Sequence, residues 1–330
     1  MSRKKTLSII ICMIFFLIIV LLGVQKYENI KNPHKAFEKD LNKLQKVQEP
    51  NIVSPEPLQE REYIQRDLIS QPQVELVDSF KKNVINILLL GVDSSEERES
   101  INMGYRSDSI IVASVDLDKK EIKMLSIPRD TYTEVPGSKN KDKINHAMAF
   151  GGGPKKNGNQ YAVEAVEGLL GIDIHYYITV DMDAVKIVVD SIGGVVIDVE
   201  RDMGSSEKVL EKGEKRLNGE EALIYIRNRD TPEGDFARIG QQQRFLLALF
   251  EQVKDNGKLS DIIPLYLKLK DKIYTDLKIE QIGALALLLK DISLEDIKTF
   301  TLKGRGMRID GIYYLEIDRK YMEDIVKEHF

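Results

Sequence analysis

An uncharged apolar run near the N-terminus constrains this chain more than any other feature. Residues 7–24 read LSIIICMIFFLIIVLLGV, with no charge between Lys5 and Lys26. A membrane-crossing helix needs about 20 apolar residues, and flanking lysines can extend to the interface to complete a slightly short one. Basic residues at 3–5 precede the run, which by the positive-inside rule keeps the N-terminus in the cytoplasm. We therefore expect a cytoplasmic tail at residues 1–6 and a transmembrane anchor after it.

A cleaved signal peptide is the alternative to an anchor, because both begin with basic residues and an apolar core. Signal cores are usually about 7–15 residues long and end in a small-x-small cleavage site. Here the apolar run is longer and is followed by GVQKYENIK, which has no such site. We expect an uncleaved, single-pass anchor in the cell membrane, with the later residues extracellular.

The segment after the anchor, residues 25–83, is predicted to be an extracellular stalk. Five of the ten prolines fall in it among many charges, a composition that disfavours a packed core. Residues 35–46 could form a short amphipathic helix, but a solvated spacer is the preferred interpretation. The only cysteine, Cys12, lies in the apolar run, so neither a disulfide framework nor a cysteine zinc site can form.

Residues 84–330 are predicted to form one α/β domain, with a mixed sheet layered between helices. Apolar runs at 84–93, 109–116, 121–128, 176–181 and 195–199 predict strands, and further short strands are expected at 297–302 and 312–317. Helical spacing predicts helices at 160–170, 184–192, 219–225, 238–256, 260–270, 279–290 and 318–329. Because four residues join the second and third strands, these two must be antiparallel, whereas alternating strands and helices favour parallel pairing elsewhere.

Two aspartates stand at predicted strand ends, where ligands commonly bind in α/β sheets. Asp93 closes the first strand and Asp108 opens the second. Two such carboxylates could hold Mg²⁺, which takes one or two carboxylates together with phosphate oxygens and water. In the alternative interpretation Asp93 caps a turn and Asp108 pairs with Arg106.

Arginines gather at two further places. Arg129 follows the third strand in SIPRD and could point into a cleft or pair with Asp130. The stretch 226–244, IRNRDTPEGDFARIGQQQR, is the densest cluster. Its arginines could clamp a pyrophosphate around Asp235, because guanidinium forks match phosphate oxygens. A salt-bridge network among Asp230, Glu233, Asp235 and the arginines is the alternative. The net charge of −5 gives no basic face for nucleic acid, so any anion site must be local.

Six segments, taken in order, resemble the LytR-CpsA-Psr family. They are INILLLGVDS (85–94), YRSDSIIVASVD (105–116), LSIPRDTY (125–132), KINHAMAFGG (143–152), DSIGGVVIDV (190–199) and RLNGEEALIYIRNRDTPEGDFARIGQQQRF (216–245). The resemblance implies an α/β fold with an apolar tunnel for a polyprenyl tail. It implies a membrane-anchored transferase that moves an undecaprenyl-pyrophosphate-linked glycopolymer, of teichoic acid or capsule type, onto peptidoglycan and releases lipid phosphate.

The resemblance also implies roles for individual residues. Asp93 and Asp108 would hold Mg²⁺, and Asp235 would be the base for the acceptor hydroxyl, with Arg238 and Arg129 also catalytic. The pyrophosphate would be bound by a set of polar side chains: Arg106, Arg129, Arg227, Arg229, Arg238 and Gln242.

This chain departs from the family pattern at one position of the cluster. The family commonly has a second arginine three residues after the one at 238, where this chain has Gln241. Arg244, one turn later, is the candidate replacement. Two other functions are compatible with the same residues: a non-catalytic surface module that binds lipid pyrophosphates or regulates envelope assembly, and a hydrolase of the lipid pyrophosphate.

Overall fold

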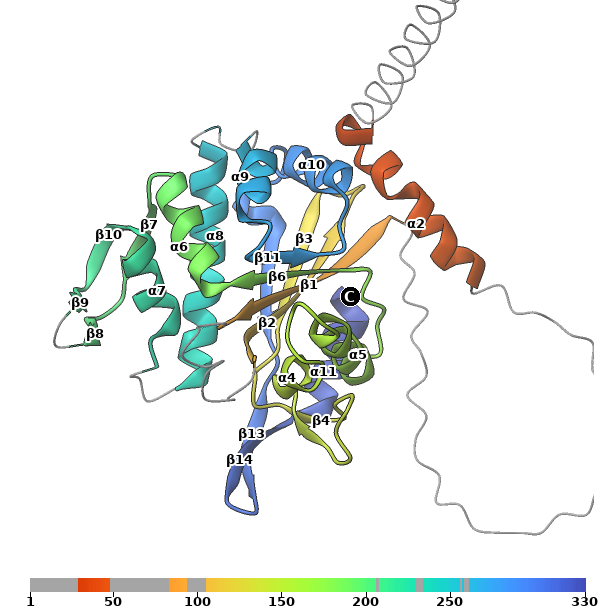
Figure 1. The fold of residues 1–330 in the computed structure, drawn as a ribbon, viewed down its shortest axis with the longest axis vertical. Helices are drawn as coiled ribbons and strands as arrows, with labels where there is room; N and C mark the ends of the chain where they lie inside the picture. Colours follow the sequence, from red (N-terminus) through yellow and green to blue (C-terminus); the bar gives the residue numbers. More distant parts are fainter. Residues whose placement is uncertain are drawn as a thin grey trace, which may run out of the picture.

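The computed structural model describes residues 29–47, 83–93, 105–205, 208–229, 234–255, 257 and 261–330 of the chain. The predicted anchor and much of the predicted stalk lie outside these residues. In the described part, no helix has both the length and the apolar character needed to cross a membrane. The described residues form the mixed α/β architecture that the sequence predicts (Figure 1).

A six-stranded sheet forms the centre of the described part. Its order is β11 (Ile273–Thr275), β6 (Tyr176–Asp181), β1 (Val84–Val92), β2 (Ser107–Asp116), β3 (Glu121–Ser126) and β12 (Ile297–Thr301). The predicted β2–β3 hairpin is antiparallel, while β1 pairs in parallel with β6 and β3 with β12. β1 is almost continuously apolar, VINILLLGV, because it is a central strand covered on both faces.

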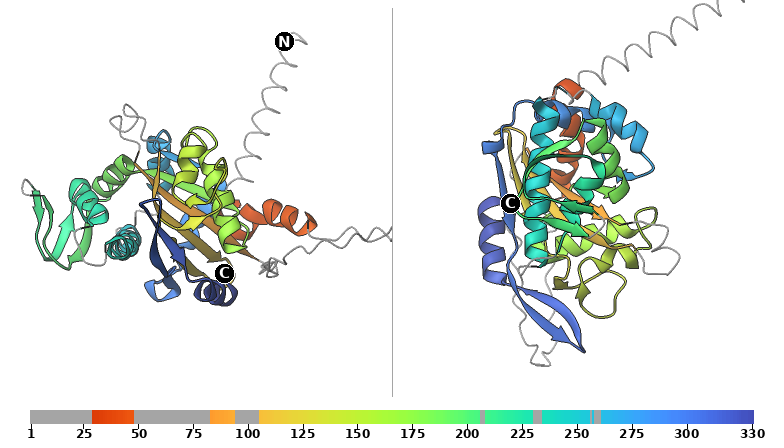
Figure 2. Two further views of the ribbon diagram at one scale, coloured as in Figure 1. Left: turned by 90° about the horizontal axis from the view of Figure 1, so that it is seen from below. Right: turned by 90° about the vertical axis from the view of Figure 1, so that its left-hand side faces the viewer.

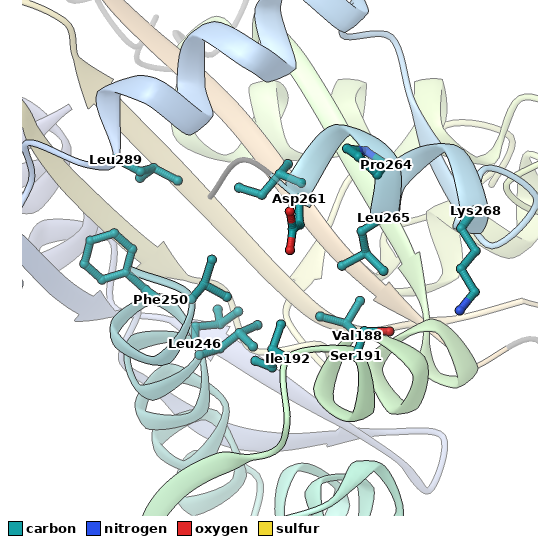
Figure 3. A pocket seen from close by; sticks show the side chains of 13 residues that line it. Val188, Ser191, Ile192, Leu246, Phe250, Asp261, Pro264, Leu265, Lys268 and Leu289 are labelled. Atoms are coloured by element: carbon teal, nitrogen blue, oxygen red, sulfur yellow. The ribbon is translucent and has the colours of Figure 1, made fainter. Parts of the chain in front are cut away.

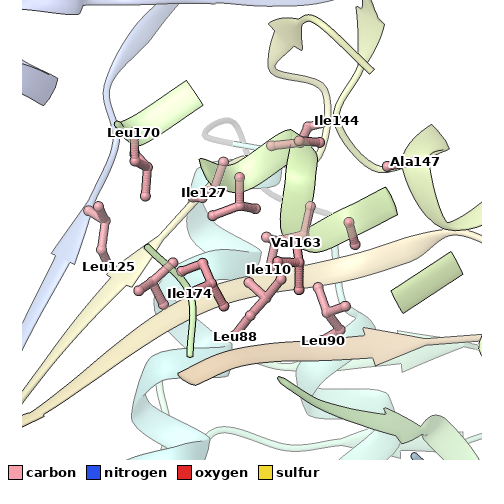
Figure 4. Close-up of a cluster of buried hydrophobic side chains, with 14 of the residues drawn as sticks. Leu88, Leu90, Ile110, Leu125, Ile127, Ile144, Ala147, Val163, Leu170 and Ile174 are labelled. Atoms are coloured by element: carbon pink, nitrogen blue, oxygen red, sulfur yellow. The ribbon is translucent and has the colours of Figure 1, made fainter. Parts of the chain in front are cut away.

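One face of the sheet is covered by α4 (His146–Phe150), α5 (Gly158–Leu170) and α11 (Arg319–His329). Leu88 and Leu90 of β1 point into this core, with Ile110 of β2 beside them (Figure 4). The alternate β1 residues, Ile85 and Ile87, point into a second core on the opposite face. This period-two alternation is what a sheet between two helical layers requires.

The second core lies under α2 (Pro33–Val47), α10 (Ile279–Leu288) and part of the long helix α8 (Asp235–Asp255). A third core joins α8 to a lobe beside the sheet. The lobe comprises α6 (Met182–Ser191), β7 (Val195–Val199), β8 (Met203–Ser205), β9 (Lys208–Leu210), β10 (Gly213–Leu217) and α7 (Gly219–Arg227). Figure 2 shows this lobe to one side of the sheet.

Several smaller elements complete the described fold. These elements are β4 (Tyr132–Thr133), β5 (Asp142–Lys143), α9 (Ile262–Leu269), the 3₁₀ turn η2 (Leu294–Asp296), β13 (Gly304–Ile309) and β14 (Ile312–Ile317). The hairpin of β13 and β14 projects from the body at the end opposite α9 and α10 (Figure 1).

The interpretation of residues 35–46 as a solvated spacer is wrong, because α2 packs against the domain. Phe37 is fully buried and its ring meets the ring of Tyr176 edge-on, with centroids 5.5 Å apart. The Asp40 carboxylate accepts hydrogen bonds from the Tyr176 hydroxyl and the Gln281 amide, each at 2.9 Å. Truncating a buried phenylalanine costs about 3–5 kcal/mol, so Phe37 alone contributes substantially to docking of the helix.

Candidate active site

The residues singled out in the sequence come together where several elements end. Asp93 follows β1 directly, and Arg129 lies three residues after β3. The β1–β2 register shifts here: Gly91 pairs with Ser109 but Val92 with Ser107, which leaves Asp108 as an extra residue. Such a β-bulge turns a side chain away from the regular alternation. The bulge thus directs the Asp108 carboxylate toward the arginines.

The polypeptide that carries the densest cluster joins the end of one helix to the start of the next. Arg227 is the last residue of α7, and Arg229 follows it by two residues. The next helix, α8, begins at Asp235 and not at Arg238. Asp235 and Arg238 therefore lie on adjacent turns of one helix face. The N-terminal end of a helix also favours negative charge, so an anion bound here would be stabilised.

Arg129 connects the two sides of the site. Its Nη1 atom lies 2.5 Å from Oδ1 of Asp108, and its Nε atom lies 3.5 Å from Oδ1 of Asp235. Burial alone would raise the pKa of Asp108, but the facing guanidiniums, Arg129 above all, hold that pKa below its usual value. Asp108 therefore stays ionised and balances part of the positive charge. It does not pair with Arg106, as the alternative interpretation had it.

Asp235 has the opposite balance. Burial raises the pKa of its carboxyl, and the attraction of Arg238 and Arg129 offsets this only in part. Nη2 of Arg238 lies 2.5 Å from Oδ1 of Asp235. Even so, neither carboxylate oxygen accepts a hydrogen bond of good geometry from a described residue. A carboxylate with open acceptor positions and a raised pKa is suited to take a proton from a bound hydroxyl group.

Arg238 is the most enclosed of the cations. Its side chain is 2% exposed. Its Nη2 atom donates to the backbone carbonyl of Asp108. Burial lowers the pKa of Arg238 to about 10, so the group remains charged at neutral pH. A buried and permanently charged guanidinium is pre-organised to stabilise negative charge that forms beside it.

The remaining arginines are more open. Arg227 is 46% exposed with Nη2 3.6 Å from Oδ1 of Asp93, and Arg229 is 45% exposed with Nη2 3.8 Å from Oδ2 of Asp108. Arg106 is half-buried and forms no ion pair with another residue in the described part of the chain. These long contacts leave donor groups available for an incoming anion. Asp230 and Glu233, the other members of the alternative salt-bridge network, lie outside the described residues.

Two glutamines on the turn after Arg238 have the same structural role. Gln241 is fully buried and, in the amide orientation that suits its neighbours, donates to the carbonyls of Tyr225 and Asn228. Gln242 donates to the carbonyl of Ile226 at 3.4 Å. Both residues thus attach α8 to the end of α7. They hold the turn that presents Arg227 and Arg229.

Arg244 does not replace the missing arginine. Its Nη2 atom lies 2.9 Å from Glu200, and its Nε atom donates to the Tyr225 hydroxyl. Six residues separate it from Arg238, which places it about 120° away around the helix. The substitution at 241 is therefore not compensated from this position.

Lys143 of β5 was not singled out from the sequence. Its Nζ atom lies 2.6 Å from Oδ1 of Asp130, the residue next to Arg129, and its side chain is 18% exposed. Nε of Arg129 is in turn 3.7 Å from Oδ2 of Asp130, so the expected Arg129–Asp130 pair forms. It is the longest of the ion pairs described for Arg129. Lys143 lies in the segment KINHAMAFGG, and that location was the only available signal. Its neighbour His146 is bonded to Asp142 at 2.9 Å, a structural contact.

An apolar cavity of about 250 Å³ begins beside this cluster. Ser109 and Gly91 at the strand ends and Gln242 of α8 form its wall nearest the charged residues. The rest is lined by apolar side chains of β1, β2, β6, β11, α6, α7 and α8. A second cavity, of about 480 Å³, lies between α6, α8 and α9, where Leu265 and Val188 face each other (Figure 3). The two share the lining residues Val188, Leu246 and Leu249.

Asp93 and Asp108 are compatible with Mg²⁺ in their chemistry. No group of three or more His, Cys, Asp or Glu side chains able to hold a metal occurs in the described part of the chain. Two carboxylates are nevertheless what Mg²⁺ commonly takes from a protein when phosphate oxygens and water complete its shell. Both carboxylates face guanidiniums, so each already points toward the place where a phosphate would bind.

A cluster of arginines beside an apolar cavity is suited to amphiphiles with an anionic head and an apolar tail. The chain belongs to the LytR_cpsA_psr family, which it matches over residues 56–330. The predicted resemblance is thereby confirmed.

Named relatives and solved structures agree with this membership. The polyisoprenyl-teichoic acid–peptidoglycan teichoic acid transferase TagU of Bacillus subtilis is 32% identical over 249 residues, 75% of this chain and 78% of TagU. The crystal structure of B. subtilis TagV superposes with a TM-score of 0.64 at 33% identity, covering 75% of this chain and 96% of that one. A structure titled TagT bound to LIIa-WTA superposes with a TM-score of 0.61 at 28% identity, covering 75% and 89%.

Proposed function

We propose that this protein is a cell-envelope phosphotransferase that uses Mg²⁺. It moves an undecaprenyl-pyrophosphate-linked anionic glycopolymer, of the teichoic acid or capsule type, onto a peptidoglycan hydroxyl and releases lipid phosphate. The names of its relatives support a polyisoprenyl-linked donor and a peptidoglycan acceptor. We further propose that the chain is anchored in the cell membrane through residues 7–24, with the domain outside.

The observation that carries the proposal is the position of the arginine cluster beside the apolar cavity, next to its lining residues Gly91, Ser109 and Gln242. A polyprenyl pyrophosphate likewise has an anionic head, which would meet the arginines, joined to an apolar tail, which would enter the cavity. Burying each methylene of the tail contributes about 0.8 kcal/mol, and the arginines neutralise the pyrophosphate charge. The cavity thus supplies affinity, and the cluster fixes the position of the reacting phosphorus.

Asp235 is the proposed base. The acceptor hydroxyl gives its proton to the Asp235 carboxylate while its oxygen forms a bond to the phosphorus that carries the glycan. The bond from that phosphorus to the bridging oxygen breaks, and the electron pair leaves with the lipid phosphate. Arg238 and Arg129 lie beside Asp235 and stabilise the negative charge that spreads over the phosphoryl oxygens.

The other polar residues bind the donor. Arg227, Arg229 and Arg106 are exposed enough to meet the pyrophosphate, while Gln242 holds α8 to the end of α7. Bound at Asp93 and Asp108, Mg²⁺ would neutralise phosphate charge. The arginine set alone does not separate transfer from hydrolysis, because either a sugar hydroxyl or water can attack the same phosphorus.

A reconstituted transfer assay tests this function. The full chain in lipid vesicles is given a polyprenyl-pyrophosphate-linked glycan and peptidoglycan oligomers, with Mg²⁺ or with a chelator. We expect glycan-phosphate on peptidoglycan together with stoichiometric prenyl phosphate, both dependent on the metal. Prenyl phosphate without coupled glycan would identify a hydrolase instead, and tight donor binding with neither product would identify a binding module.

A further inference from the structure

Helix α9 is unusually exposed for its composition. Its sequence is IIPLYLKL, yet Leu269 is its only fully buried residue. Pro264 and Leu267 are exposed, the latter to 49%. Lys268 and Lys270 are exposed next to them. An apolar surface bordered by lysines is the pattern of a helix that lies in a membrane interface.

The beginning of the described chain is held at this same surface. A Cβ atom added to Gly283 of α10 would lie 3.2 Å from Ile30 and 3.2 Å from Ile263 of α9. Ile30 therefore sits where α9 and α10 meet. The predicted membrane span ends at residue 24, six residues earlier, and six residues reach at most about 20 Å. The α9–α10 surface must then lie close to the bilayer.

Docking of α2 makes this placement rigid. The buried Phe37 and the bonds from Asp40 to Tyr176 and Gln281 fix the helix to the sheet and to α10. Lys278 adds an ion pair to Asp40 at 3.2 Å. A flexible stalk would leave the orientation of the domain free, whereas this contact sets it.

The cavity system runs between this surface and the active site. Asp235 is at one end of α8 and the cavity wall residues Phe250 and Val253 are near the other, so about 25 Å of helix separates them. A 150 Å³ cavity holds benzene, about 25 Å³ per carbon, so the two cavities hold roughly ten and twenty carbons. That is well short of an undecaprenyl tail. Part of the tail must leave the cavity at the α9 end.

We propose that the α9–α10 surface lies on the membrane and that α2 sets this orientation. The donor then keeps the far end of its tail in the bilayer, while the rest of the tail fills the cavities and the head reaches Asp235 on the side facing the wall. The inference rests on the proposed function for the identity of the donor. The orientation itself can be measured without any transfer.

The first test measures contact of α9 with lipid. In the full chain with Cys12→Ser, a single cysteine is introduced by Leu267→Cys, or as a control by Val209→Cys on β9, which is 56% exposed. Each carries a polarity-sensitive fluorophore in phosphatidylglycerol-rich vesicles that contain a nitroxide-labelled lipid. We expect quenching several-fold stronger at 267 than at 209. Equal quenching at the two positions would overturn the proposal. Shielding of the fluorophore at 267 from water in detergent without lipid would also overturn it, and would point to a protein partner.

The second test releases α2. Phe37→Ala with Asp40→Ala should slow transfer from a long-chain donor embedded in vesicles by about tenfold or more, because the advantage of a fixed orientation is lost. Transfer from a water-soluble short-chain donor should not change. Glu38→Ala, at an exposed position of the same helix, is the matched control.

Each outcome of this second test has one meaning. An equal loss with both donors would show that α2 serves only to stabilise the fold, and would contradict the proposal. A wild-type chain inactive with both donors would instead contradict the proposed function, and the quenching measurement would still decide the orientation.

Discussion

At Asp235 two effects act on one carboxyl group in opposite directions. Burial raises its pKa, and the nearby arginines, Arg238 first, lower it by a smaller amount. At Asp108 burial also raises the pKa, but there Arg129 at 2.5 Å, together with Arg238 and Arg229, outweighs burial. The pKa of Asp235 is thus raised and that of Asp108 lowered, so one site can provide both a base and a group that stays ionised.

This separation predicts the pH dependence of transfer. A base must be deprotonated, so the rate should rise with pH through a pKa above 3.8, the ordinary value of Asp. Because the folded state binds this proton more tightly than the unfolded state, the contribution of Asp235 to stability falls as pH rises through the same pKa. The measurement is the pH profile of single-turnover transfer. A flat profile across the acidic range would remove Asp235 from the role of base.

The site residues could be found in the sequence because they stand in recognisable segments. Which side chains they pair with could not be predicted from the sequence. Asp93, Asp108 and Arg129 come at strand ends, which periodicity locates. The pairing of Asp108 with Arg129 depends on a β-bulge, and nothing in a single sequence marks a bulge. Lys143 was missed because its ion-pair partner, Asp130, lies in a different segment of the sequence.

At the scale of elements, apolar periodicity predicted the strands and most helices, since these bury one or both faces. The errors fall where local and tertiary signals differ. The sequence predicts the start of this helix at Arg238, whereas α8 begins at Asp235. The prolines and charges of residues 25–83 favour a spacer, whereas α2 packs against the domain through the buried Phe37. Its contacts to Tyr176 and Gln281 come from distant parts of the chain.

The joint between α7 and α8 gives a prediction at this scale. Gln241→Leu would leave the carbonyls of Tyr225 and Asn228 without its amide, at a cost of about 1–3 kcal/mol in unfolding free energy. Urea unfolding of the full chain in detergent measures this cost. Gln160→Leu, at an exposed position of α5, should change stability by less than about 0.5 kcal/mol. Equal stabilities for the two variants would show that Gln241 does not hold the joint.

At the scale of the whole molecule, the apolar cavities could not be derived from residue patterns. Their walls come from β1, β2, β6, α6, α8 and α9, and each wall residue has the same sequence signal as a packed core residue. The tunnel was expected only through the family resemblance. Its position relative to the arginines follows from topology, because α8 carries Arg238 near one end and the cavity wall along its length.

The residues shared by the two cavities predict an effect that depends on the length of the donor tail. Leu246 lines both cavities, so Leu246→Trp would reduce the space where they adjoin. Each displaced methylene loses about 0.8 kcal/mol, and two would weaken binding by about tenfold. Affinities of long-chain and short-chain donors, measured by calorimetry, should therefore diverge in this variant. If both donors weaken alike, or neither does, the tail does not pass Leu246.

The central claim is that the arginine cluster binds a pyrophosphate while Asp235 takes the proton in transfer. The most direct measurement compares donor affinity and single-turnover transfer for the wild-type chain and Asp235→Asn, in the same vesicles. Removing a positioned base should lower the rate by about 10²–10⁴-fold, whereas donor affinity should be retained because the arginines are intact. Transfer at the wild-type rate in Asp235→Asn would contradict the account.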